Sequence, residues 1–252
     1  MVAVYAHSIR GEPQDQWETL SDHSAAVAER AAEFAGYLGW GEALRCAGQL
    51  HDIGKLSPDF QAYIRELRSS GGDHSSAGAR IALERCGPHM GKILAAIIAA
   101  HHSGLADGED LTRRMQAAAK LLPPGWQEQT GPLPEPATLI PKVPPPLGGP
   151  KGFGWSFLIR MLFSCLVDAD FIATELFYAK ATGDQVERGG HTDLGALRDR
   201  LRSHMAAVAA RRAGAPTPLN ALRAEILGNA VAKAPLPPGL FSLTVPTGGA
   251  RR

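Results

Sequence analysis

Histidines and aspartates stand at the ends, and on the apolar faces, of segments whose spacing otherwise predicts buried helices. They are His23, the adjacent pair His51 and Asp52, His74, the adjacent pair His101 and His102, and Asp170. An imidazole or a carboxylate on a buried helix face is costly unless a partner compensates it. A divalent metal ion suits both groups. The pattern therefore predicts a metal site assembled from several helices.

Hydrophobic residues repeat at helical spacing along most of the chain. Ser21 is the expected N-cap of the first helix. A second helix is expected to carry His51 and to stop at Gly54. Further helices are expected to begin at Pro58, His74 and Pro88, and others to run over residues 155–179, 193–213 and 219–232. Residues 1–20 look irregular, and only residues 241–245 predict a strand, so the expected fold is an all-α bundle.

Two aspartates on the long helix expected over residues 155–179 are candidates for the same metal ligand. Trp155, Leu162, Leu166 and Asp170 lie on one stripe of that helix, whereas Asp168 is turned away from it by the rotation of about 100° per residue. The stripe favours Asp170 as the ligand, and Asp168 remains the alternative.

Composition narrows the class of protein further. The net charge is +1, so the overall charge does not indicate a nucleic-acid partner. The three cysteines have no metal-ribbon spacing and are expected to be reduced core residues of a cytoplasmic protein. No signal peptide or membrane span is expected. Residues 123–150 hold ten prolines, which predicts a surface loop inserted into the bundle.

The ligand types indicate which metal ions would bind. Imidazoles supply neutral nitrogen donors, and an aspartate such as Asp52 has two oxygens that can bridge two ions. A mixed nitrogen and oxygen set suits transition metals. The expected divalent ions are Mn, Fe, Ni or Co, with Zn and Mg as alternatives.

The order of these motifs resembles the HD phosphohydrolase superfamily. More narrowly, it is similar to the HD nuclease domain of the helicase–nuclease of type I CRISPR systems. The stretches that carry the resemblance are Ala-His-Ser at 6–8, Ser-Asp-His at 21–23, His-Asp-Ile-Gly-Lys at 51–55, Asp-His-Ser at 73–75, His-His-Ser-Gly-Leu at 101–105 and Asp-Ala-Asp at 168–170. His-Asp-Ile-Gly-Lys is shared across the superfamily, whereas His-His-Ser-Gly-Leu is much more particular.

The resemblance implies roles for the individual residues. One metal ion would be held by His23, His51, Asp52 and Asp170, and a second by Asp52, His74, His101 and His102, with Asp52 bridging. The activity implied is endonuclease cleavage of single-stranded DNA in antiviral defence, with a metal-activated hydroxide attacking the scissile phosphate. Asp52 and Lys55 are the expected catalytic residues. Ser103 is a further candidate for contact with the phosphate, and Lys55 could equally be an ordinary cation at a helix C-terminus. His7 is expected to lie outside the cage, either beside it or in local packing.

The C-terminal tail resembles the opening of a helicase. Residues 241–249 read Phe-Ser-Leu-Thr-Val-Pro-Thr-Gly-Gly, as a strand leading into a P-loop, but the phosphate-binding lysine of that motif is missing. The expected division is an HD nuclease domain over 1–213 and a linker helix with a truncated P-loop strand over 214–252. A helicase domain in the intact protein and the type I CRISPR surveillance complex are the expected partners.

Two other functions stay open. The first is an HD phosphohydrolase acting on nucleotides or cyclic nucleotides, which would need a closed base pocket. The second is a non-enzymatic docking module. The arginines of the helix over residues 193–213 could follow a DNA backbone or form an exposed face paired with acids.

Overall fold

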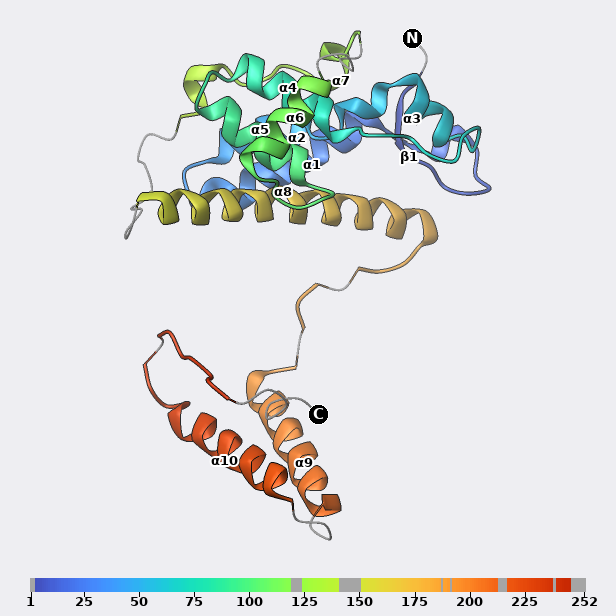
Figure 1. Ribbon diagram of the computed structural model, residues 1–252. Coiled ribbons are helices and arrows are strands. Elements are labelled where there is room, and N and C mark those ends of the chain that lie inside the picture. Colours follow the sequence, from blue (N-terminus) through green and yellow to red (C-terminus); the bar gives the residue numbers. More distant parts are fainter. Residues whose placement is uncertain are drawn as a thin grey trace. The chain divides into compact units, whose positions relative to one another are not determined.

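Helices dominate the chain (Figure 1). The computed structural model describes residues 3–118, 124–140, 151–186, 188–190, 192–212, 217–237 and 239–245. Within these ranges the only sheet has two short strands. The predicted all-α class is confirmed.

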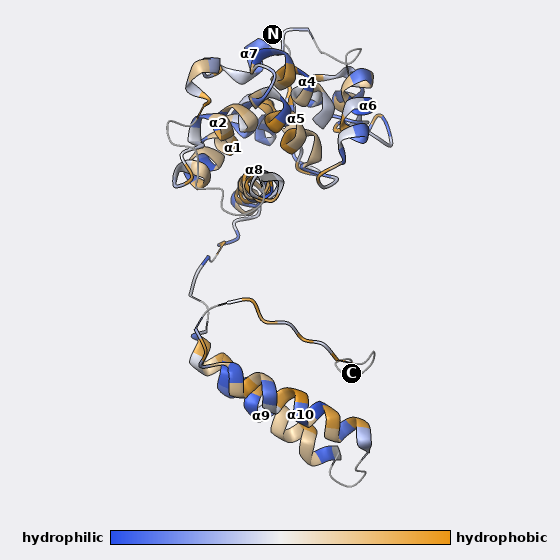
Figure 2. Ribbon diagram, turned by 60° about the vertical axis from the view of Figure 1, so that its left-hand side comes forward, coloured by the Kyte–Doolittle hydropathy of each residue, from blue (hydrophilic) through white to orange (hydrophobic). Residues whose placement is uncertain are grey.

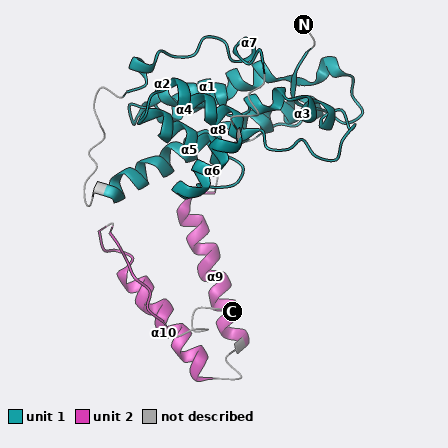
Figure 3. Cartoon of the chain, turned by 45° about the horizontal axis from the view of Figure 1, so that its top comes forward, with its two compact units in different colours: residues 1–186 teal, residues 187–252 magenta. Residues whose placement is uncertain are grey.

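The chain divides into two compact units, Met1–Val186 and Glu187–Arg252 (Figure 3). By this division the helix over residues 194–212 groups with the C-terminal unit, whereas the HD domain was expected to end at residue 213. Compactness does not test where the functional domain ends, so residue 213 stays a prediction.

The first unit is a bundle of eight α-helices with three short 3₁₀ helices among its described residues. The α-helices are α1 (Leu20–Gly36), α2 (Gly41–Leu50), α3 (Pro58–Tyr63), α4 (Ser75–Arg85), α5 (Met90–Ala100), α6 (Gly108–Ala118), α7 (Gln127–Thr130) and α8 (Lys151–Thr182). The 3₁₀ helices are η1 (Gln14–Gln16), η2 (Ile53–Leu56) and η3 (Pro136–Thr138). Helix α1 packs against α2 and α8, and α4 packs against α5.

The core of this unit lies where these helices meet. Leu44, Leu50, Leu94 and Leu166 are fully buried there. The hydrophilic segments of α6 and α7 lie at the edge of the unit (Figure 2). Removing this apolar surface from water stabilises the bundle, at about 25 cal/mol per Å².

Helix α1 begins one residue before the predicted N-cap, so the assignment of Ser21 was wrong. Thr19 has an extended backbone, and its hydroxyl accepts a hydrogen bond from the backbone N–H of Asp22 at 3.1 Å. Thr19 is therefore the cap. Helix α5 likewise starts at Met90 rather than at Pro88, because residues 87–89 form a turn.

The strands are not where the sequence pattern placed them. Strand β1 (Tyr5–His7) pairs antiparallel with β2 (Glu18–Thr19), inside the segment expected to be irregular. Residues 241–245, expected to be a strand, have no strand partner among the described residues. A strand needs a neighbour to satisfy its backbone groups, and β1 finds one only through the turn that returns the chain to β2.

The described part of the proline-rich segment is less loop-like than expected. Residues 124–140 contain α7 and η3, and Leu139 is buried in the core. This segment therefore packs on the bundle rather than projecting from it, and residues 141–150 lie outside the described residues.

Helix α8 runs longer than the predicted 155–179. Its buried stripe starts at Leu158 and continues through Leu162, Leu166 and Ala173. Trp155, which the periodicity placed on this stripe, is 45% exposed.

The second unit contains α9 (Leu194–Arg212) and α10 (Pro218–Lys233), close to the predicted ranges. Thr217 caps α10 by accepting a hydrogen bond from the N–H of Asn220. The side chains of Arg198, Arg200 and Arg202 are exposed, and Arg198 pairs with Asp199 at 2.9 Å. Among the described helices of both units, none is long and apolar enough to cross a membrane.

Candidate metal centre

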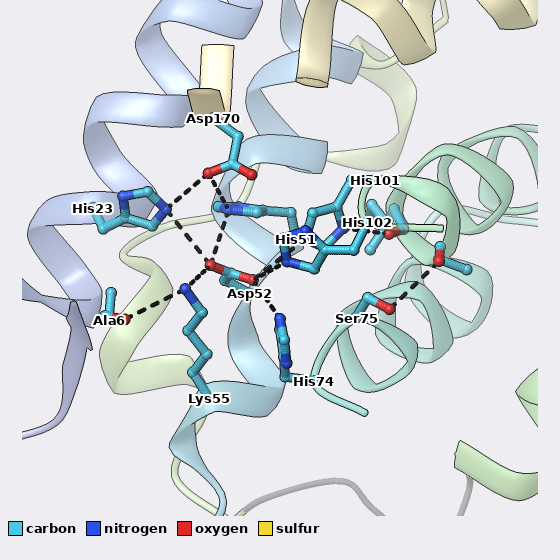
Figure 4. Close-up of polar contacts among 12 residues, drawn as sticks. Ala6, His23, His51, Asp52, Lys55, His74, Ser75, His101, His102 and Asp170 are labelled. Atoms are coloured by element: carbon cyan, nitrogen blue, oxygen red, sulfur yellow. Dashed lines mark hydrogen bonds and ion pairs between the residues drawn. The ribbon is translucent and has the colours of Figure 1, made fainter. Parts of the chain in front are cut away.

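Seven predicted residues from distant parts of the first unit converge on one point (Figure 4). His23 comes from α1, the pair His51 and Asp52 from the end of α2, and Asp170 from α8. His74 precedes α4, and the pair His101 and His102 follows α5. They form two groups, His23–His51–Asp52–Asp170 and Asp52–His74–His101–His102. Within each group, one donor atom per residue lies within 4.8 Å of the others.

Asp52 belongs to both groups, and its two oxygens face different ways. Oδ2 lies 3.5 Å from Nε2 of His23 and 3.3 Å from Nε2 of His51. Oδ1 lies 3.7 Å from Nε2 of His74 and 3.4 Å from Nε2 of His101. His102 is the most distant member, with Nε2 4.0 Å from Oδ1. A carboxylate so placed can hold two ions at once.

The backbone orients three of the imidazoles. Nδ1 of His51 donates to the carbonyl of Gly48 at 2.7 Å, Nδ1 of His101 to that of Ile98 at 2.6 Å, and Nδ1 of His74 to that of Gly72 at 3.3 Å. A carbonyl oxygen can only accept, so the proton of each neutral ring stays on Nδ1. Nε2 then directs a lone pair toward Asp52, which is the tautomer a metal ligand needs.

The converging atoms are buried and lack ordinary partners. His23, His51 and Asp52 have no exposed surface. Within the described part of the chain, Nε2 of His23, His51, His74 and His101 and Oδ1 of Asp52 make no hydrogen bond. Buried polar atoms are nearly always satisfied in native proteins. These unpartnered nitrogen and oxygen atoms can donate lone pairs to a metal ion. Together with the ring tautomers, they fit one or two divalent cations.

Two glycines allow the segments to approach closely enough. A Cβ on Gly54 would lie 2.3 Å from the carbonyl oxygen of His74, and one on Gly78 would lie 1.7 Å from that of Leu50. Both contacts are shorter than any tolerated approach, so only glycine fits. The glycine of the His-Asp-Ile-Gly-Lys stretch therefore brings His74 against the turn that carries Asp52.

Helix α8 presents Asp170, not Asp168, to the cluster. Oδ1 of Asp170 lies 3.2 Å from Nε2 of His23 and 3.6 Å from Nε2 of His51. Asp168 is exposed. This arrangement follows the helical stripe that favoured Asp170.

Lys55 is buried and contacts the shared carboxylate. Its Nζ lies 2.6 Å from Oδ2 of Asp52 and 3.4 Å from the carbonyl oxygen of Ala6. A solvent-exposed helix-end cation would make no such contact. Contact with a phosphate remains a prediction for this residue, as it does for Ser103, whose hydroxyl accepts a hydrogen bond from Arg114 at 3.3 Å.

Sequence reasoning missed Glu18. Its Oε2 lies 3.3 Å from Nδ1 of His23 and 2.7 Å from Nδ1 of His7. His7, left outside the cage, therefore lies beside it, joined through this carboxylate. No sequence signal marked Glu18, which lies five residues before His23 and just ahead of the cap of α1; the pairing of β1 with β2 brings His7 to the same carboxylate.

Arg114 of α6 was also missed. Nη1 donates to the carbonyl oxygen of Ala99 at 2.7 Å, and Nη2 donates to Oγ of Ser75 at 3.0 Å. Ser75 follows His74, and Ala99 precedes His101 by two residues. Arg114 thus ties together the two segments that carry the ligands of the second group.

The two groups differ in their protonation. Burial opposes the charge on His51, but the carboxylates of Asp52 and Asp170 outweigh it and raise its pKa to about 9. The pKa of His23 is also raised, because Asp170, Asp52 and Glu18 outweigh burial. Burial and the neighbouring His101 instead lower the pKa of His102 to about 4, and burial lowers that of His74.

Comparison with known families agrees with this site. Residues 20–139 match the HD domain family, and the matched range holds every predicted ligand except Asp170. The match supports the HD phosphohydrolase superfamily, whose members bind divalent metals, and indicates a metal-dependent hydrolase. Comparison with curated proteins gives no significant match.

Proposed function

We propose that the chain is a metal-dependent nuclease that hydrolyses phosphodiester bonds of single-stranded DNA. The observation that carries the proposal is the shared carboxylate of Asp52, which faces two groups of ligand atoms at once. Paired metal sites bridged by one carboxylate are typical of enzymes that displace an alkoxide from a phosphate.

Divalent cations held by these residues would lower the pKa of water to about 7 and neutralise charge on the phosphate. The protein's own part is to hold the ligands rigidly. Backbone carbonyls fix the rings of His51 and His101, and Glu18 faces the outer nitrogen of His23. Lys55, beside Asp52 and lining the adjoining cleft, is placed to offer its charge to a phosphate oxygen.

The biological setting that we propose rests on the motif resemblance alone. The His-His-Ser-Gly-Leu stretch and the P-loop-like tail support action on DNA unwound by a type I CRISPR surveillance complex, with a helicase domain as partner. Hydrolysis of nucleotides or cyclic nucleotides is the alternative, because the HD domain alone is compatible with either substrate.

The test is cleavage of circular single-stranded DNA by the purified chain with Mn²⁺ or Ni²⁺ and without ATP, with EDTA as the control. We expect nicking and degradation that EDTA abolishes. Hydrolysis of mononucleotides or cyclic nucleotides alone would support the alternative, and metal-dependent cleavage of neither would exclude both.

Helix α8 supplies a matched pair of variants. Asp170→Ala removes a carboxylate that faces His23 and His51, whereas Asp168→Ala removes an exposed one from the same helix. We expect the first to lose cleavage and bound metal and the second to retain both. Metal analysis of the protein purified without chelator then identifies the ion.

A further inference from the structure

A cleft of about 580 Å³ opens beside the second ligand group. Its lining includes His74 and His102 at the metal centre and Lys55 beside Asp52. The aromatic side chains of Phe60, Tyr63 and Tyr178 also line it. A substrate phosphate at the ligands would therefore place its neighbouring groups in a cleft with aromatic walls.

Two series of ring contacts lead from the rim of this cleft to the ligands. On one side the ring of Tyr63 lies 5.8 Å from that of Phe60, and Phe60 lies 5.2 Å from His74. On the other side the ring of Tyr178 lies 5.8 Å from that of His7, which lies 4.6 Å from His23. Each series begins at a tyrosine and ends at a predicted ligand.

Both tyrosines present ring surface to solvent. Tyr63 is 43% exposed and Tyr178 is 39% exposed. The hydroxyl of Tyr178 donates to the carbonyl oxygen of Ser8 at 3.3 Å, which fixes the ring at the rim. Apolar ring faces held in place and left uncovered favour a flat aromatic ligand.

The charges at the rim are already paired. Arg68 pairs with Asp59, and Glu66 lies 3.8 Å from Arg10. The rim therefore offers no unpaired cation for a phosphate among these residues, and the exposed rings are what distinguishes it. Recognition by stacking is accordingly favoured over recognition of the backbone.

We propose that Tyr63 and Tyr178 form a stacking platform for the bases of a single-stranded nucleic acid whose phosphodiester lies at the metal centre. The inference rests on the proposed function, because the phosphate is assigned to the predicted ligands. Every base offers a flat face, so the platform tolerates any sequence. In a duplex those faces are covered by neighbouring bases, so the platform selects unpaired strands.

Binding without cleavage provides the direct test. A fluorescein-labelled oligothymidylate is titrated in EDTA by fluorescence anisotropy, against an oligomer of the same length whose nucleotides lack bases. We expect Tyr63→Ala and Tyr178→Ala each to weaken binding of the oligothymidylate by about 5- to 30-fold. Binding of the abasic oligomer should be weak and unchanged, and Tyr63→Phe, which keeps the ring, should bind as the unaltered chain does.

Tyr37 provides the control, because it is 73% exposed and does not line the cleft. Tyr37→Ala should leave binding of both oligomers unchanged. Equal binding of the oligothymidylate by the unaltered chain and both tyrosine variants overturns the platform. Tighter binding of a cyclic nucleoside monophosphate than of the oligomer overturns the assignment to a strand.

A second substrate separates this inference from the proposed function. The oligomer whose nucleotides lack bases still carries phosphodiesters, so its metal-dependent hydrolysis by the unaltered chain and by Tyr37→Ala reports on the metal centre without the platform. A chain that binds bases through the tyrosines yet hydrolyses no phosphodiester refutes the nuclease and supports the platform. Hydrolysis of DNA that is indifferent to both tyrosines supports the nuclease and refutes the platform.

Discussion

Oε2 of Glu18 lies 3.3 Å from Nδ1 of His23, on the side of the ring opposite Asp52. Burial would raise the pKa of Glu18, but the imidazoles of His23 and His7 outweigh it and lower the pKa to about 2. Glu18 is therefore a carboxylate anion that faces Nδ1 of His23 at ion-pair distance. Such a carboxylate fixes the ring and makes its other nitrogen a stronger donor.

Glu18→Gln should weaken metal binding to the first ligand group by about 10- to 100-fold while leaving the fold intact. The reason is that an amide keeps the shape of Glu18 but not its charge. Titration of the apo-protein with Mn²⁺, followed by calorimetry, measures the loss. Glu12→Gln, at an exposed position before η1, is the control. Equal affinities of the two variants would exclude this role.

Asp52 and Lys55 should show strong energetic coupling in the metal-free protein. Each is buried, and removal of one takes away the nearest opposite charge of the other, a cost of about 3–5 kcal/mol for a buried pair. Asp52→Asn and Lys55→Met together should therefore destabilise the chain by less than the sum of the single changes. Urea unfolding in EDTA of the four proteins of this cycle measures the coupling, and strict additivity would contradict it.

The helical positions of the centre could be predicted from the sequence because they depend on local spacing. Asp170 follows from the stripe of α8, and His51 follows from that of α2. The neighbours of those ligands depend instead on tertiary pairing. His7 reaches Glu18 only because β2 returns to β1, and Arg114 reaches Ser75 only because α6 packs on the start of α4. Periodicity also cannot say where a bundle ends, which is why Trp155 was wrongly placed in the core.

The metal-free protein should be most stable near pH 6.5, as far as this cluster contributes, because the lowered pKa of His102, about 4, gives stability that is lost as the pH falls from 6.5 toward 4. The lowered pKa of Glu18 gives stability that is complete above its usual value of 4.5 and lost as the pH falls toward about 2. The raised pKa of His51 gives stability that is complete below its usual value of 6.5 and lost as the pH rises through about 9. Thermal unfolding in EDTA from pH 2 to 9 checks this maximum, and a Tm that climbs steadily from pH 6.5 to 9 would refute it.

Metal binding should release protons from the first ligand group but few from the second. At pH 7 His51 holds a proton, since its pKa is about 9, whereas His102 is neutral, since its pKa is about 4. A cation displaces the proton of His51, so affinity at that group should rise with pH up to about 9. Calorimetry in two buffers of different ionisation enthalpy counts the protons. His102→Ala weakens the second group, so the number of protons released per bound ion should increase. A decrease would mean that the protons come from the second group instead.

The close contacts at Gly54 and Gly78 predict that a single added methyl group there lowers the stability of the protein. Gly78→Ala would force α4 away from the end of α2, and Gly54→Ala would displace His74. Overpacking of this kind costs about 1–3 kcal/mol, or roughly 2–12 °C in Tm for a chain of this size. Gly36→Ala, where a Cβ would meet nothing within 4 Å, should leave Tm unchanged or raise it. If Gly78→Ala behaved like Gly36→Ala, the close approach of α4 to Leu50 would be wrong.

Arg114 should control the second ligand group from outside it. Its guanidinium joins the start of α4 to the end of α5, so Arg114→Ala frees both His74 and the pair His101 and His102 to move apart. We expect loss of affinity for the ion at that group and little change at the group of His23 and His51. Arg113→Ala is the matched control, since Arg113 is exposed and pairs only locally with Asp110. Metal titration of the two variants compares the groups, because the proton release described above marks which one is filling. Retention of two equivalent sites in Arg114→Ala would show that α4 and α5 hold their ligands without this residue.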